Sequence, residues 1–182
     1  MGKFSGHEKP EMAARLRVLC LGNELLADDA FGHVVADRLV AKLSKNAVEH
    51  SPAATAPAGV EVVKSPLAGL GLLDELTGVS RLIVVDSVQT GKAPPGTLHI
   101  LQEDELKTPA GPSPHYFGIF ESLGLARRLG LPAPEEVIIL AVETADCTTL
   151  GGNMHPAVLA AIPKVVRYVA EIIASVPSKS GG

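Results

Sequence analysis

Apolar and polar positions change period along this chain in a way that predicts strands and helices in turn. Short apolar runs rich in β-branched residues predict buried strands, and apolar residues three or four positions apart predict helices with one buried face. The predicted strands cover residues 16–21, 60–63, 81–86, 97–101 and 136–142. The predicted helices cover about 30–43, 67–76, 115–130 and 156–173. Pro156 suits the first position of the last helix because its φ is already helical.

The order of these elements, β-α-β-α-β-β-α-β-α, indicates the fold class. Strands that alternate with helices form mostly parallel sheets, because each helix returns the chain to the edge where the previous strand began. We therefore predict an α/β protein, a three-layer αβα sandwich with a mostly parallel, twisted five-stranded sheet and helices on both faces. The length of 182 residues suits a single domain, which we place at 15–175 between flexible tails at 1–14 and 176–182.

The composition of the chain disfavours several classes of binding partner and several kinds of site. The net charge of −4 is modest and no block of Lys and Arg is present, which disfavours nucleic acid and anionic membranes. No segment has the length of a membrane span, and the first residues lack the apolar core of a signal peptide. Two cysteines are too few for a disulfide framework or a thiolate metal cage. We expect a monomeric cytoplasmic protein.

The stretch 21–32, which joins the first strand to the first helix, gathers three acidic residues: Glu24, Asp28 and Asp29. A carboxylate at a helix N-terminus is stabilised by the exposed N–H groups and by the helix dipole. One cap accounts for one aspartate, so the second carboxylate suggests a further role.

Two more ionisable residues occupy comparable places. Asp86 follows a central apolar strand, and His115 begins a helix. If the strands are neighbours, Asp29, Asp86 and His115 meet at the carboxyl edge of the sheet, where α/β proteins build their sites. Two carboxylates and an imidazole suit nickel, zinc or iron, and the carboxylates alone could handle a proton and a water. Taken singly, each residue also fits a structural role, as a helix cap, a turn former or a helix start.

Three sequence blocks in this order resemble the endopeptidases that mature the large subunit of NiFe-hydrogenases. GNELLADDAFG at 22–32 is similar to the family's Gly-Asn-x-Leu-x-x-Asp-Asp/Glu-x-x-Gly. IVVD at 83–86 with PGT at 95–97 resembles the second block, and SPHYFG at 113–118 matches a Ser-x-His block ahead of a helix. The resemblance runs from about residue 18 to residue 168.

The resemblance implies a function and a role for each matching residue. Asp29, Asp86 and His115 fall on nickel-binding positions, and Gly22, Asn23 and Asp28 match the loop that shapes the site. The nickel is recognised in the precursor of a NiFe-hydrogenase large subunit, and it can be absent from the isolated protein. The enzyme then removes a C-terminal extension from that precursor.

The sequence leaves the chemistry of cleavage open. Asp29 or Asp86 could activate a water as general base, or the metal could polarise the scissile carbonyl or supply hydroxide. The alternative function is a non-catalytic metal-checking or assembly protein on the same fold, which binds the precursor without cutting it.

Other residues give weaker candidates. His33 lies four residues after Asp29 and so shares its helix face, although a surface histidine is the commoner outcome. Cys147 could form a nucleophilic pair with His115 or His155, but no spacing supports it. Gly-x-Ser-x-Gly and phosphate-loop motifs are absent, and no Gly-x-Gly-x-x-Gly starts at Gly22.

Overall fold

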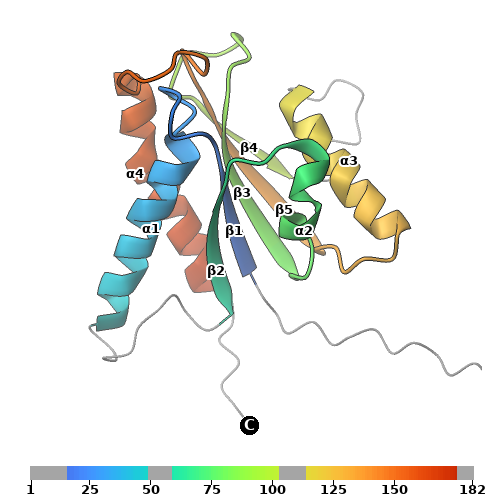
Figure 1. The fold of residues 1–182 in the computed structure, drawn as a ribbon. Coiled ribbons are helices and arrows are strands. Elements are labelled where there is room, and N and C mark those ends of the chain that lie inside the picture. Colours follow the sequence, from blue (N-terminus) through green and yellow to red (C-terminus); the bar gives the residue numbers. More distant parts are fainter. Residues whose placement is uncertain (1–15, 49–58, 103–113, 176–182) are drawn as a thin grey trace, which may run out of the picture.

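The structure, a computed structural model, describes residues 16–48, 59–102 and 114–175 (Figure 1). The predicted tails at 1–14 and 176–182 therefore lie outside the described residues. The strands are β1 (Leu16–Leu21), β2 (Val60–Ser65), β3 (Arg81–Val88), β4 (Leu98–Gln102) and β5 (Glu136–Glu143). The helices are α1 (Phe31–Val48), the 3-10 helix η1 (Gly69–Leu72), α2 (Leu73–Leu76), α3 (Pro114–Arg128) and α4 (Pro156–Ser175).

The strands of the described chain form one sheet in the order β2-β1-β3-β5-β4. β2, β1, β3 and β5 pair in parallel, and β4 pairs antiparallel with β5 at one edge. The mostly parallel five-stranded sheet predicted from the sequence is thereby confirmed.

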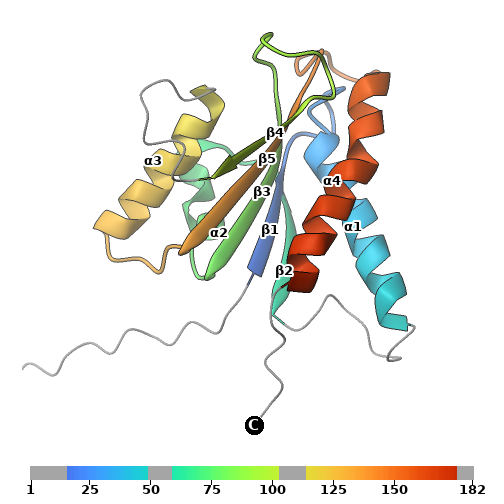
Figure 2. The same cartoon turned by 180° about the vertical axis from the view of Figure 1, so that it is seen from behind.

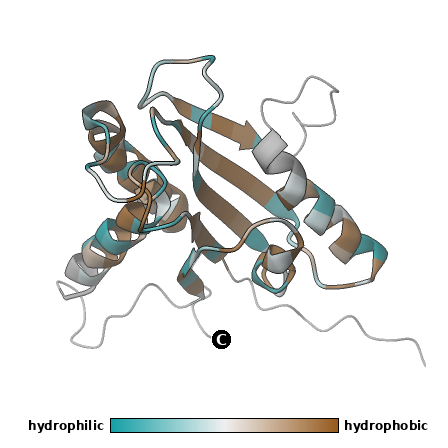
Figure 3. Cartoon of the chain, turned by 45° about the horizontal axis from the view of Figure 1, so that its top comes forward, coloured by the Kyte–Doolittle hydropathy of each residue, from teal (hydrophilic) through white to brown (hydrophobic). Residues whose placement is uncertain are grey.

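Helices cover both faces of the sheet and bury two separate apolar clusters (Figures 1 and 2). α1 and α4 pack on one face, against side chains such as Ile83 and Val85. η1, α2 and α3 cover the other face, against Leu82 and Val84. The consecutive apolar residues of β3 thus serve both layers, which gives the strands their hydrophobic colour in Figure 3. Within the described ranges, no helix has both the length and the apolar composition needed to cross a bilayer.

The sheet has a switch point between β1 and β3, because the chain leaves these two neighbours toward opposite edges. In such sheets a crevice opens at the carboxyl ends of the two strands. The pairing of β1 with β3 ends at Cys20 and Val85, whereas β3 continues to Val88 through its pairing with β5. Asp86 therefore lies inside β3, beyond its last partner on β1, and does not end the strand as the sequence predicted.

Val84 offers a test of the packing. Its side chain is fully buried among the residues that η1, α2 and α3 cover. Val84→Asp places an unpaired carboxyl there, and we expect the free energy of unfolding to fall by about 4 kcal/mol or more. Val40→Asp on the exposed side of α1 is the control, with an expected change of about 0.5 kcal/mol or less. Urea titration followed by circular dichroism measures both, and equal losses would contradict the packing.

Candidate functional site

The loop between β1 and α1 folds back against the end of its own strand. Gly22 has a φ of +143°, and a Cβ built there would lie 2.0 Å from the carbonyl oxygen of Asp29. The N–H of Asn23 donates to that same carbonyl at 3.2 Å, and the Asn23 side-chain oxygen accepts the N–H of Leu25 at 3.0 Å. This turn returns Asp29 to the carboxyl end of β1, and only glycine fits at its start.

Asp28 joins this loop to the loop between β5 and α4. Its side chain is 1% exposed, and its carboxylate accepts the backbone N–H groups of Ala145 (2.9 Å), Asp146 (3.0 Å) and His155 (2.6 Å). Its own N–H donates to the carbonyl of Asp146 at 3.0 Å. Hydrogen bonds to an ionised acceptor are stronger than neutral ones, so this buried carboxylate fixes the two loops relative to each other.

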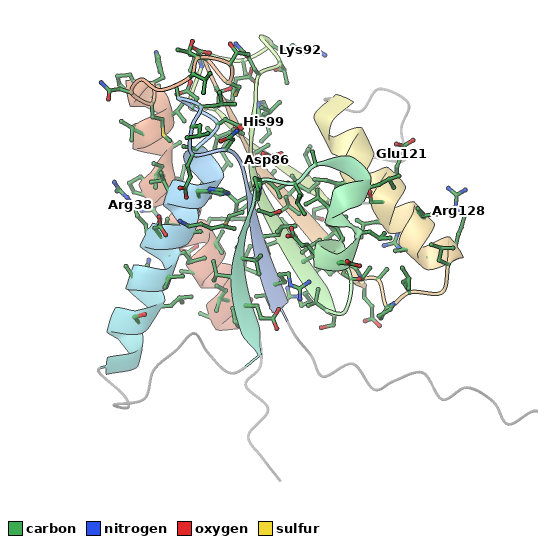
Figure 4. All side chains as sticks on the ribbon, in the orientation of Figure 1. Arg38, Asp86, Lys92, His99, Glu121 and Arg128 are labelled. Atoms are coloured by element: carbon green, nitrogen blue, oxygen red, sulfur yellow. The ribbon has the colours of Figure 1, made fainter. Side chains whose placement is uncertain are left out.

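Asp29 and Asp86 line the same cavity, of about 510 Å³, at the switch point of the sheet. Figure 4 shows Asp86 near the upper end of the strands. Ser87 connects the two carboxylates, since its hydroxyl donates to Asp29 Oδ1 at 2.8 Å and its N–H donates to Asp86 Oδ1 at 2.8 Å. The structure therefore brings together two of the three residues that the sequence singled out.

The environment of Asp86 disfavours its charged form. Burial is the main cause, and with the nearby charge of Asp29 it raises the pKa of Asp86 from 3.8 to about 7, against the opposing effect of the Ser87 N–H. Among the described residues, no cationic side chain is paired with Asp29 or Asp86. The cavity thus holds two carboxylates that a cation would stabilise.

Apolar side chains also line the cavity, among them Leu67, Leu72 and Ile119. Ile119 belongs to α3, and His115 is the second residue of that helix, one turn earlier. The His115 side chain lies outside the described residues. Among the side chains that are described, no three of His, Cys, Asp or Glu gather closely enough to hold a metal ion. The ligand set of Asp29, Asp86 and His115 therefore stays a prediction.

The weaker candidates have other partners. The His33 side chain is buried and not at the surface as expected, and its ring lies between Glu24 Oε1 (3.2 Å from Nδ1) and the Ser65 carbonyl (3.4 Å from Nε2). Cys147 lines the cavity, but its Sγ contacts the hydroxyls of Thr144 at 2.9 Å and Ser87 at 3.8 Å.

No activated thiol results at Cys147. Burial, as the largest influence, raises the pKa of the Cys147 thiol, although the hydroxyls of Thr144 and Ser87 act to lower it. The His155 ring accepts the N–H of Ala157 at 3.2 Å, at the start of α4. The described contacts thus do not favour the Cys147–His155 pair considered from the sequence.

Another buried carboxylate, that of Glu143, was not predicted from the sequence. It is 0% exposed and accepts the N–H and hydroxyl of Thr90 (both 2.7 Å) and the N–H of Gly91 (2.8 Å), with His99 Nε2 at 3.3 Å. Burial alone would raise its pKa, but these hydrogen bonds hold the pKa of Glu143 below its usual range. Glu143 thus anchors the β3–β4 loop beside the cavity, and a lone acid after an apolar strand was the available signal.

The chain is similar to known proteins in sequence. A family model described as hydrogenase maturation protease matches residues 38–172. The chain belongs to the hydrogenase maturation protease family. The hydrogenase expression/formation protein HoxM of Azotobacter vinelandii is 30% identical over 165 residues, which cover 89% of this chain and 73% of the relative. The hydrogenase 2 maturation protease of Escherichia coli is 32% identical over 120 residues, 64% of this chain and 65% of the relative.

The fold agrees with this family. The hydrogenase maturating endopeptidase HybD from E. coli superposes with a TM-score of 0.66 at 27% identity, over 88% of this chain and 92% of that protein. The family resemblance and the fold class expected from the sequence are both confirmed. As a member of a maturation protease family, the chain is a peptidase. The roles of Asp29, Asp86 and His115 stay predictions, because these similarities name no residues.

Asp86 gives a pH-dependent test of the site. Since its pKa rises from 3.8 to about 7 on folding, the folded state binds the proton more tightly than the unfolded state. The metal-free protein should therefore lose stability as the pH rises from about 4 to about 7. Asp86→Asn, whose side-chain oxygen can still accept the Ser87 N–H, should remove this loss and be more stable at pH 8 by up to roughly 4 kcal/mol.

Urea titrations at pH 4 and pH 8 measure the difference between Asp86→Asn and the wild type. The gain at pH 8 should shrink toward zero at pH 4, whereas Asp74→Asn at an exposed position should show little dependence on pH. An equal effect of Asp86→Asn on stability at both pH values would contradict the raised pKa of Asp86.

Proposed function

We propose that this chain is the endopeptidase that removes the C-terminal extension from the precursor of a NiFe-hydrogenase large subunit. The supporting observation is the pair of carboxylates, Asp29 and Asp86, in one cavity at the switch point of the sheet. Family membership supports the class of reaction and the hydrogenase partner.

The site favours recognition of a divalent cation that the precursor carries. Two carboxylates linked through Ser87, with no cationic side chain paired to them in the described chain, offer oxygen ligands on one side of a cavity. His115, in the first turn of α3, would add a nitrogen ligand. Both Figures 1 and 2 place that turn at the same end of the molecule as the β1–α1 and β5–α4 loops. Such a set leaves coordination positions for ligands from the precursor, so the nickel belongs to the substrate.

The same carboxylates supply the groups that hydrolysis needs. A carboxylate within the cavity can take a proton from water as the water attacks the scissile carbonyl, and can return it to the leaving amine. Ser87 holds the carboxylate of Asp29 in one orientation through its 2.8 Å hydrogen bond.

A cleavage assay tests the proposal. The purified protein is mixed with the precursor, either loaded with nickel or metal-free, and intact mass is recorded over time. We expect loss of a C-terminal segment from the loaded precursor alone. Asp29→Ala, Asp86→Asn and His115→Ala should each lower the rate by about 10²-fold or more, whereas Asp74→Asn should keep it.

Two results would contradict the proposal in different ways. Equal cleavage of loaded and metal-free precursor would contradict the proposed nickel recognition but still support the peptidase activity. Stable binding without any change in mass would instead support the metal-checking protein, because that alternative needs the partner and the ion but no hydrolysis.

A further inference from the structure

A second hollow lies on the other side of the β1–α1 loop from the carboxylates. Its volume is about 550 Å³. The β1–α1 loop and the start of α1 form one wall, and the β5–α4 loop and the start of α4 form the other. We call this hollow the apolar groove, after the side chains of Leu25, Leu26, Met154 and Leu159 that line it.

Backbone contacts between the two loops fix the shape of the groove. Leu26 forms β-bridges with Leu150 and Gly151, and the Gly151 N–H donates to the Leu25 carbonyl at 2.8 Å. The Ala27 N–H donates to the Thr149 carbonyl at 3.2 Å. Since Asp28 ties the same loops together, the backbone of both walls is fixed.

Large apolar side chains stand exposed at this groove. Leu25 is 66% exposed, Leu150 is 76% exposed and Leu159 is 43% exposed. Leu25 and Leu159 line the groove, and Leu150 directly precedes the lining residue Gly151. Exposed apolar residues that gather at one hollow mark an interaction site, whereas single scattered ones do not.

The lining fits aliphatic side chains better than a small polar molecule. Among the described residues that line the groove, Glu24 is the only ionisable one, and its carboxylate already lies 3.2 Å from His33 Nδ1 and 3.4 Å from Lys64 Nζ. Sites for small polar ligands instead present several polar groups that converge on the ligand.

The groove adjoins the candidate site across a single loop, and this proximity points to its occupant. Asn23 and Asp29 line the carboxylate cavity, whereas Glu24 and Ala27, between them in sequence, line the groove. One loop therefore separates the two hollows. A protein that places its scissile bond at Asp29 must cover the surface around that loop, so its neighbouring surface reaches the groove.

We propose that the apolar groove is a docking site for the precursor protein, which presents aliphatic side chains to Leu25 and Leu159. The inference rests on the proposed function, since the partner is the same precursor. Docking at a distance from the scissile bond contributes equally to substrate and transition state, so it lowers KM without changing kcat.

The test compares substitutions at exposed positions, where folding is not at risk. Leu25→Ser combined with Leu159→Ser should raise KM for the whole precursor about tenfold and leave kcat within twofold. Val40→Ser and Leu129→Ser, at residues 48% and 61% exposed that do not line the groove, are the matched controls and should leave both constants within twofold. An unchanged KM in the double variant would overturn the docking site while the peptidase stands.

A binding measurement separates failure of docking from failure of the proposed function. In the Asp29→Ala background, the double substitution should weaken binding of the precursor about tenfold by calorimetry. If this weakening occurs but the wild type never cleaves the precursor, the groove is supported and the proposed peptidase function is overturned. If sedimentation shows a wild-type dimer that the double substitution dissociates, the groove is a self-contact and the inference is overturned.

Discussion

The buried carboxylate of Asp28 is the constraint on which the candidate site depends. Its three backbone N–H partners all lie more than 100 residues away along the chain, with separations of 117, 118 and 127. The loop after β1 and the loop after β5 therefore keep one arrangement. Both hollows, the carboxylate cavity and the apolar groove, take walls from these loops. Replacement of Asp28 by alanine would leave these three backbone N–H groups without their side-chain acceptor.

Tight backbone contacts add to this constraint. A Cβ at Gly22 would meet the Asp29 carbonyl, and a Cβ at Gly32 would lie 2.0 Å from the Leu21 carbonyl. The loop and the first turn of α1 can therefore approach the end of β1 only because both residues are glycines. The result presents Asp29 beside Asp86, where burial and like charge oppose ionisation of Asp86. That arrangement costs stability, as sites shaped for function often do.

The sequence predicted the fold well because the fold follows from local periodicity. The run 82–85 is apolar on both faces, which placed β3 at the centre of the sheet. The predicted end of that strand, at residue 86, was wrong because the extension to Val88 depends on pairing with β5. Ser87 and Glu143 were missed for the same kind of reason, since their partners Asp29 and Thr90 lie 58 and 53 residues away. The apolar strand before each loop led the sequence analysis to place Asp29 and Asp86 at one edge of the sheet, and the structure brings them to one cavity, while their metal-binding roles stay predictions.

We propose that Asp29 and Asp86 act together as one cation-recognition site, and carboxyl-detected NMR can observe each of these two side chains. The protein is labelled with ¹³C at the aspartate carboxyl carbons and titrated with paramagnetic Ni²⁺. We expect the Asp29 and Asp86 signals to broaden together, before those of Asp37 and Asp74, and we expect Asp29→Ala to weaken the broadening at Asp86. Broadening of Asp37 or Asp74 first, or of Asp29 without Asp86, would contradict this proposal.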